Sequence, residues 1–253
     1  MSLRTIKKEM KILTSKNQKN YHSPLRYPGG KTSLLPFFEK IIEDHGLEKI
    51  TYVEPFAGGA GAALGLLFSG KVERIVINDL DKAIYSFWLS AIYESEKFIR
   101  KIYATPITIA EWKKQREIYR NVKSDTFRLG FATFFLNRTN ISGILDGGPI
   151  GGLDQKGKWK VDARFNKKNL AAKIRRIALH KERIFVSQKD GLDLIGKYLD
   201  KKNAFIYLDP PYYEKGATLY LNYYQKENHT ALAKKLNHHK NSFWLLTYDN
   251  KRE

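Results

Sequence analysis

The sequence has no cysteine among its 253 residues, which excludes both a disulfide framework and a thiolate metal site. It also lacks a cluster of histidine and acidic residues at metal-site spacing, so we expect no bound metal. Its longest run of low polarity, around Ala57–Phe68, is far shorter than the roughly 20 residues that a membrane span requires. The N-terminus has no signal-peptide pattern. We therefore expect a soluble, cytoplasmic protein that does not associate with membranes.

Acidic residues are scarce relative to basic ones. The chain contains 45 Lys and Arg against 26 Asp and Glu, a net charge of +19. This excess goes well beyond what solubility requires and predicts a polyanionic partner, with nucleic acid first and an anionic membrane surface second. Residues 1–20 are basic and have little periodic apolar content, which is typical of a flexible arm. Such an arm either touches phosphates or stays solvated.

Neither a Walker loop nor a complete dinucleotide-binding fingerprint occurs, although two glycine-rich segments precede expected helices. The first segment, 24–31, ends in Gly29, Gly30 and Lys31, ahead of a helix that apolar spacing predicts over 32–42. Its backbone amides and the lysine suit an anionic or carboxylate group. The alternative for this segment alone is a plain turn that caps the helix.

The second glycine-rich segment, 54–61, follows a strand expected over 50–53 and opens an apolar helix over 62–68. Its glycines permit a tight turn and the close approach of a ligand to the helix N-terminus. The next expected strand, 74–78, leads into Asp79, about 20 residues beyond the glycines, where an acid meets ribose hydroxyls. This order predicts a nucleoside-binding βαβ unit, for which NAD remains an alternative.

The segment 205–213 carries the strongest chemical signal in the sequence. Four residues of strand character run into Asp209, Pro210 and Pro211, and because proline cannot continue a ladder, the strand must end at the acid. The Asp209 carboxylate and the Pro210 carbonyl then converge beside the ring of Tyr212 at the carboxyl end of a strand. Two acceptors and an aromatic ring suit an exocyclic amine on a planar heterocycle. An ordinary strand-to-loop turn is the alternative.

The alternation of strand and helix is interrupted between residues 83 and 179. Residues 83–136 are mostly helical, with aromatic residues that we expect mainly in the core. The segment 137–166 contains many Gly and Pro residues, which predicts a loop and hairpin. Its Asn, Arg, Gln and Lys side chains are of the types that contact base edges and phosphates. The alternative is a solvated basic loop. Later elements are expected as a basic helix 168–179, a strand 183–187, a helix 191–199, a strand 203–208, a helix 225–238 and a strand 242–247.

Taken in order, the motifs resemble those of the Dam-like, alpha-class DNA adenine-N6 methyltransferases. They lie at 24–31, 54–61, 78–81, 137–143, 209–212 and 247–250, and the resemblance covers nearly everything from residue 24 onward. It implies an α/β fold, a Rossmann-like S-adenosylmethionine-dependent methyltransferase sheet with an inserted helical target-recognition domain. The implied domains are the arm 1–20, a discontinuous catalytic domain 21–82 and 180–253, and a helical and hairpin recognition domain 83–179.

The resemblance further implies site-specific methyl transfer from S-adenosylmethionine to an adenine flipped out of double-stranded DNA, by a monomer and without a metal. The residues implied for catalysis are Asp209, Pro210, Pro211 and Tyr212. Those implied for the cofactor are Tyr27, Gly29, Gly30, Lys31, Glu54, Pro55, Phe56, Ala57, Gly58, Gly59, Gly61, Asp79, Leu80, Asp190 and Asp209. Those implied for DNA are Arg138, Asn140, Gln155, Lys158, Lys160 and Arg164, of which Gln155, Lys158 and Lys160 lie on the expected hairpin 145–162.

Two other functions stay open. One is a catalytically silent DNA-binding homologue, and the other is methylation of a different exocyclic amine, on cytosine N4 or in RNA, because the motif recognises an amine rather than one base. The sequence also departs from the family at its end. Family chains continue past the strand that carries 247–250, whereas this one ends at Glu253, so we expect a catalytic domain shortened at its C-terminal end.

Overall fold

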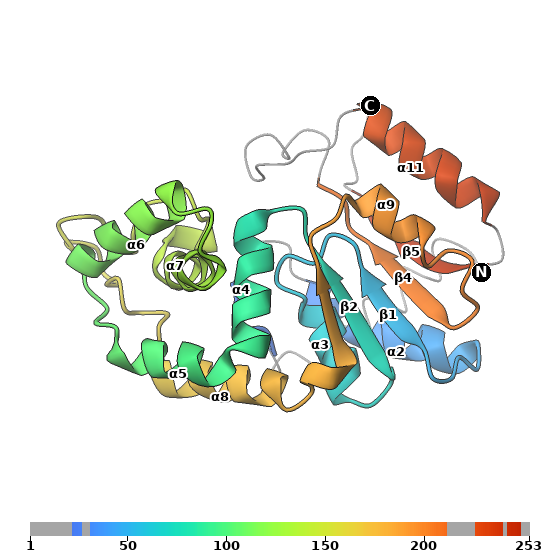
Figure 1. The fold of residues 1–253 in the computed structure, drawn as a ribbon, viewed down its shortest axis with the longest axis horizontal. Coiled ribbons are helices and arrows are strands. Elements are labelled where there is room, and N and C mark those ends of the chain that lie inside the picture. The colour runs from blue at the N-terminus through green and yellow to red at the C-terminus, as the bar shows by residue number, and fades with distance from the viewer. Residues whose placement is uncertain (1–21, 27–30, 212–225, 240–241, 249–253) are drawn as a thin grey trace.

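The structure is a computed structural model that describes residues 22–26, 31–211, 226–239 and 242–248 (Figure 1). Its centre is a five-stranded parallel sheet in the order β3-β2-β1-β4-β5. The strands are β1 (Thr51–Glu54), β2 (Arg74–Asn78), β3 (Ile184–Ser187), β4 (Ala204–Leu208) and β5 (Phe243–Leu246). All five expected strands are present within one residue at either end. The predicted α/β class and Rossmann-like sheet are confirmed.

The order of the strands creates a topological switch point at the middle of the sheet. The chain runs outward from β1 through β2 to β3 and then returns to β4 on the other side of β1. Val53 of β1 is therefore paired with Val76 of β2 on one side and with Ile206 of β4 on the other. Open α/β sheets bind their ligands outside the carboxyl ends of the strands at such a point.

Helices cover both faces of the sheet, which explains why its central strands are almost continuously apolar. On one face, the ring of Phe38 from α2 (Leu35–Asp44) contacts Phe205 of β4 edge-on, with 6.0 Å between ring centroids. The buried helix α3 (Gly61–Phe68) packs on the same side. On the opposite face, Ile206 packs with Leu194 of α9 (Gly191–Gly196) and Leu232 of α11 (Lys226–His238).

The segment between β2 and β3 is helical, as the sequence predicts. Its helices are α4 (Lys82–Tyr93), α5 (Ser95–Ala104), α6 (Ile109–Asn121), α7 (Thr126–Thr139) and α8 (Lys167–Ala178). Most of the aromatic residues are buried as expected, whereas Tyr93 and Tyr103 are exposed. Helix α7 lies so close to α4 that a Cβ atom at Gly130 would stand 2.4 Å from the carbonyl oxygen of Ser86. Glycine is therefore required at that crossing.

The helical segment shares one continuous core with the sheet. Side chains of α4, α7 and α8 belong to the same buried cluster as those of β1, β2 and α3. Figure 1 shows α4 standing between the sheet and helices α6 and α7, whereas α8 runs below α4 toward the sheet. The boundary between a catalytic and a recognition domain thus stays a prediction. Among the described helices, none is long and apolar enough to cross a membrane.

The predicted hairpin after α7 is wrong. Residues 144–166 form turns and bends, and within the described chain the β pairing here is one isolated bridge between Asn140 and Pro149. The side chain of Gln155 replaces ladder hydrogen bonds: its Nε2 donates to the Ile150 carbonyl (2.9 Å), and its Oε1 accepts from the Val161 amide (2.8 Å). Gln155 is thereby committed to bracing this loop.

Candidate functional site

Polar side chains meet at the carboxyl edge of the sheet. Glu54 ends β1, Asp79 follows β2, Asp190 lies three residues beyond β3, Asp209 follows β4 and Thr247 follows β5. Because all five strands are parallel, their carboxyl ends share one edge. The structure therefore gathers, around the switch point, acids that lie far apart in the sequence.

The glycine-rich turn after β1 is fastened to the end of β2. Gly58 has a left-handed φ of +47°, and its N–H donates to Asp79 Oδ2 at 2.9 Å. Asp79 Oδ1 accepts from the Asp81 amide at 3.0 Å, and the Gly58 carbonyl accepts from Trp88 Nε1 at 2.9 Å. Burial, together with the nearby charge of Asp81, raises the pKa of Asp79 to about 7. A hydroxyl or cationic ligand partner would favour its ionised form.

Asn78, the last residue of β2, connects the loops that follow β1 and β3, and it was not among the predicted site residues. Its Nδ2 donates to the carbonyls of Pro55 and Lys189, both at 2.9 Å. Its Oδ1 accepts from Ser187 Oγ (2.7 Å) and the Lys189 amide (3.0 Å). The sequence did contain a signal for Asn78: it is a polar residue at the end of an otherwise apolar strand, directly before Asp79.

Glu54 is buried beneath the glycine turn, with 5% of its surface exposed. Its Oε1 accepts from Tyr52 OH and from the Ala63 amide in the first turn of α3, both at 3.1 Å. Burial raises the pKa of Glu54 to about 8, although the two hydrogen bonds act in the opposite direction. The side chain is thus committed to the protein, which favours a supporting role under the turn over direct contact with a ligand.

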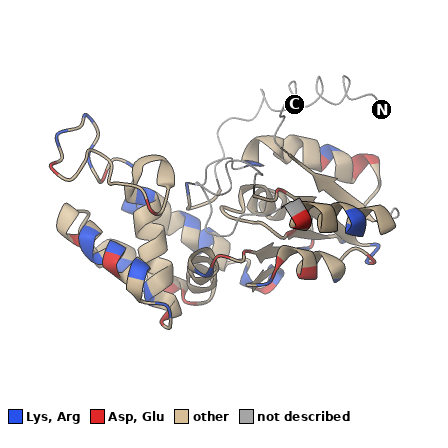
Figure 2. Ribbon diagram, turned by 90° about the horizontal axis from the view of Figure 1, so that it is seen from above, with Lys and Arg blue, Asp and Glu red and all other residues tan. Residues whose placement is uncertain are grey.

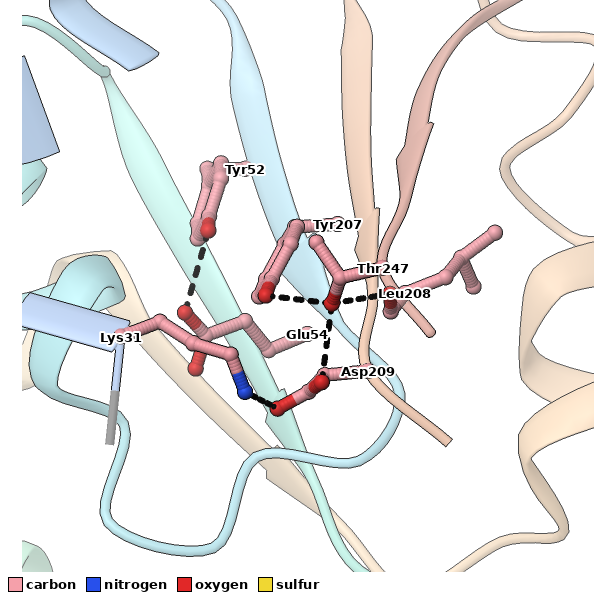
Figure 3. A network of polar contacts seen from close by, with 7 residues as sticks. All are labelled: Lys31, Tyr52, Glu54, Tyr207, Leu208, Asp209 and Thr247. Carbon is pink, nitrogen blue, oxygen red and sulfur yellow. Dashed lines mark hydrogen bonds and ion pairs between the residues drawn. The ribbon is translucent and has the colours of Figure 1, made fainter. Parts of the chain in front are cut away.

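The carboxylate of Asp209 is held from both sides (Figure 3). Its Oδ2 forms an ion pair with Lys31 Nζ, the first residue of the 3-10 helix η1 (Lys31–Leu34). Its Oδ1 accepts from Thr247 Oγ1 at 2.8 Å. The Lys31 and Asp209 side chains keep 21% and 22% of their surface exposed. A fixed carboxylate that is still open to solvent is suited to accept hydrogen bonds from a substrate.

The other predicted cofactor residues lie on this edge or in the turn. Asp190 is half-buried and caps α9, with Oδ1 accepting from the Leu192 amide at 2.7 Å. Leu80 is 41% exposed, and Phe56 is partly buried against the smaller core. Pro55, Ala57 and Gly59 are buried in the turn, and Gly61 begins α3. Tyr27, Gly29, Gly30 and Tyr212 lie outside the described residues, as does the arm 1–20.

Comparison with models of protein families identifies the family to which this chain belongs. The family model for D12 class N6 adenine-specific DNA methyltransferases matches residues 27–253, which include the sheet, the acids of its carboxyl edge and the helical segment. The chain belongs to this family. It is thus of the adenine-N6 DNA methyltransferase class, for which S-adenosylmethionine is the implied methyl donor and DNA the implied substrate. A search among curated proteins found no match.

In this D12 chain, Asn140 does not have the exposure that base contact requires. It is fully buried, and its Oδ1 accepts from Trp112 Nε1 at 2.6 Å. Its Nδ2 donates to the carbonyls of Ile144 and Leu145, at 2.7 and 2.9 Å. As a correction to the sequence analysis, Asn140 holds the turn after α7, because every polar group of its amide is already used within the chain.

Asn137, one turn earlier on α7, binds the backbone of Arg26, in the described part of the first glycine-rich segment. Its Oδ1 accepts from the Arg26 amide (2.7 Å), and its Nδ2 donates to the Arg26 carbonyl (2.9 Å). A Cβ atom at Gly143, whose φ is +78°, would lie 2.3 Å from the same carbonyl. The helical segment is therefore joined directly to the chain that leads to Lys31.

Four cations gather where α7, α8 and residues 22–26 meet, and we call them the basic cluster: Arg26, Arg138, Arg164 and Lys173. Three of these side chains donate a hydrogen bond to a backbone carbonyl, namely those of Arg26, Arg138 and Lys173. Within the described part of the chain, none of the four is ion-paired with an acid. Burial, followed by the charges of Arg26 and Arg164, lowers the pKa of Arg138 to about 10. Such uncompensated repulsion favours binding of an anion.

The loop beyond the basic cluster adds exposed cations. Lys158 and Lys160 are exposed, and Trp159 keeps 60% of its surface accessible, with Lys158 and Arg164 near its ring face at 5.9 and 5.8 Å. Figure 2 shows Lys and Arg recurring over the helices and loops on the side away from the sheet. This surface has the composition of a nucleic-acid interface.

Proposed function

We propose that this chain is a site-specific DNA methyltransferase that transfers the methyl group of S-adenosylmethionine to N6 of an adenine flipped out of double-stranded DNA. The observation that carries the proposal is the Asp209 carboxylate, fixed between Lys31 and Thr247 at the switch point of the sheet. Both the sequence motif and the position of Asp209 in the fold thus support this carboxylate as the group that accepts hydrogen bonds from the target amine.

The residues at the carboxyl edge fit S-adenosylmethionine. The half-buried carboxylates of Asp79 and Asp190 each accept amide hydrogen bonds and have further lone pairs for ribose hydroxyls and the adenine amine of a nucleoside. The turn at Gly58 brings backbone close to the site without a side chain in the way. Leu80 adds an exposed apolar side chain beside them. When bound, the cofactor supplies an electrophilic methyl group on a positively charged sulfur.

Asp209 and the Pro210 carbonyl would orient the target amine. Each accepts one N–H group, which draws the lone pair of the nitrogen out of conjugation with the ring and toward the methyl group. No general base with an altered pKa is required, because holding the two reacting groups in line supplies most of the acceleration. The nitrogen becomes acidic once it carries the methyl group, and its extra proton would pass to the Asp209 carboxylate or to solvent. Lys31 keeps the carboxylate in place from the side opposite Thr247.

The amine of a stacked and paired adenine is out of reach of such a site, so the base must leave the helix. Unstacking costs a few kcal/mol, which contacts in the pocket must offset in part. Stacking on an aromatic side chain is worth about 1–3 kcal/mol per base. Tyr212 is the residue that we propose for this contact; it directly follows Pro211 and lies three residues after Asp209 in the sequence.

Identification of the methylated nucleoside tests the proposal. Duplex DNA and, in a parallel reaction, RNA are incubated with the protein and isotopically labelled S-adenosylmethionine, digested to nucleosides and analysed by mass spectrometry, and DNA binding is measured separately. We expect label in N6-methyl-2′-deoxyadenosine from DNA. Label in N4-methylcytosine or only in RNA would show a different amine substrate, and unlabelled DNA together with normal DNA binding would show a catalytically silent homologue.

The basic cluster yields a prediction about salt dependence. Arg164→Ala removes an exposed guanidinium but keeps the carbonyl that Arg138 binds, so the loop should hold its shape. If Arg164 contacts a phosphate, the slope of log K against log salt should fall by about 1, with affinity reduced alike for all sequences. The matched control is Lys71→Ala, which removes a cation paired with Glu43 ahead of β2. Equal salt slopes in both variants would contradict this assignment.

A further inference from the structure

We infer that Tyr207 and Thr247 form a hydrogen-bond relay that aims the carboxylate of Asp209, and that both are positioning residues for the methyl transfer. The inference rests on the proposed function, because it concerns how the group that grips the amine is oriented. Neither residue belongs to the site that the sequence predicts for catalysis or cofactor binding.

The direction of the relay follows from the proton inventory. Thr247 Oγ1 lies 2.8 Å from Asp209 Oδ1, 2.9 Å from Tyr207 OH and 3.5 Å from the Leu208 carbonyl. A hydroxyl has one proton to donate, and a carboxylate oxygen can only accept, so Thr247 donates to Asp209. The contact to Leu208 is at the outer limit of a hydrogen bond. Tyr207 then donates its own proton to Thr247, as the dashed lines of Figure 3 allow.

The relay begins at a side chain that the core holds firmly. Tyr207 lies on β4 with 3% of its surface exposed, and its ring packs against Phe38 of α2 with 4.8 Å between centroids. Thr247 is fixed by its backbone, since its amide donates to the Leu208 carbonyl at 3.0 Å and extends the pairing of β5 with β4. Both hydroxyls therefore have defined positions before any ligand arrives.

Asp209 is consequently restrained at both oxygens from opposite directions. Thr247 binds Oδ1 and Lys31 binds Oδ2, so rotation of the carboxylate about its Cβ–Cγ bond would weaken both contacts. Each carboxylate oxygen can accept about two hydrogen bonds, which leaves acceptor capacity for a substrate N–H. Without the Thr247 hydroxyl, the long and flexible Lys31 side chain would be the one remaining partner of the carboxylate among the described residues, and the direction of the carboxylate would be poorly defined.

The test compares Thr247→Val, Thr247→Ser and Tyr207→Phe in steady-state methylation of duplex DNA. A displacement of about 1 Å at a reacting group can cost roughly 100-fold, so we expect kcat of Thr247→Val to fall by roughly 10- to 100-fold. Cofactor affinity, measured by calorimetry, should change less than about twofold, because the relay does not reach Asp79 or Asp190. Thr247→Ser keeps the hydroxyl and should restore most of the rate.

Tyr207→Phe and the double variant show whether the two residues act in series. Tyr207→Phe leaves Thr247 free to donate to Asp209, so its loss in kcat should be smaller, roughly threefold to tenfold. The double variant Tyr207→Phe/Thr247→Val should be no slower than Thr247→Val, because the second change removes a contact that no longer leads to Asp209. Thr133→Val is the control, a buried hydroxyl that donates to the Leu129 carbonyl within α7.

The outcomes separate this inference from the proposed function. Wild-type kcat in Thr247→Val, or independent additive losses in the double variant, would overturn the relay while methylation by the wild-type chain upheld the proposed function. Transfer to cytosine N4 by the wild-type chain, with the expected ratios among the variants, would overturn the adenine assignment and uphold the relay. Absence of any methyl transfer by the wild-type chain would overturn both.

Discussion

Replacing Asp209 with alanine is expected to lower the rate of methyl transfer by at least about 100- to 1,000-fold, the typical loss when one preorganised polar group of an active site is removed. The carboxylate would no longer accept the N–H of the target amine, and Lys31 and Thr247 would both lose their shared partner. Binding of duplex DNA should stay close to that of the wild-type chain, because the basic cluster lies on residues 22–26, α7, α8 and the loop between these two helices, and does not include Asp209. The measurement is single-turnover transfer from labelled S-adenosylmethionine.

A graded variant and a control sharpen this experiment. Asp209→Asn preserves the size of the side chain and one carbonyl acceptor, so it should retain more activity than alanine. Asp44→Ala removes an exposed acid that pairs with Lys40 at the end of α2, before the amino end of β1, and should leave the rate unchanged. Unchanged transfer in Asp209→Ala would refute the role that we assign to this carboxylate.

The strand ends of this fold were predictable because their signals are local. Asp209 is followed at once by two prolines, and Asp79 directly follows an apolar strand, so each acid could be placed at a carboxyl end before any tertiary contact was known. The order of the strands then requires that these ends share one edge. Where neighbouring residues alone determine an element, the prediction was accurate: each predicted strand begins and ends within one residue of the observed strand.

Long-range hydrogen bonds account for what the sequence did not reveal. Asn140 has the side-chain type of a base reader, but Trp112, 28 residues away, binds it inside the fold. Thr247 reaches Asp209 across 38 residues, and no spacing rule predicts that pair. In place of the expected hairpin the described loop forms turns, in which the Gln155 side chain binds the Ile150 carbonyl and the Val161 amide. Composition identified these residues as polar without showing whether they face DNA or the protein.

Glu54→Gln should remove a dependence of stability on pH that the wild-type chain carries. The ordinary pKa of this carboxyl is 4.5, and burial raises it to about 8 in the folded protein. Below pH 4.5 both the folded and the unfolded chain hold the proton, and the contribution of Glu54 is fully present. As pH rises from about 4.5 to 8, the unfolded chain loses the proton first, so the free energy of unfolding falls, and the loss is complete above the folded pKa.

The glutamine amide carries no titrating proton but can still accept from Tyr52 OH and the Ala63 amide. The two proteins should therefore be of similar stability near pH 5, whereas near pH 8.5 the glutamine variant should exceed the wild-type chain by about 3–5 kcal/mol. Urea unfolding at both pH values measures this difference. Asp79, whose pKa is also raised, is present in both proteins, so its contribution cancels when the two are compared. Glu48→Gln, at an exposed position before β1, is the control and should leave the difference at zero. Parallel pH profiles for Glu54→Gln and the wild-type chain would mean that Glu54 is already ionised at neutral pH, held by its hydrogen bonds against the cost of burial.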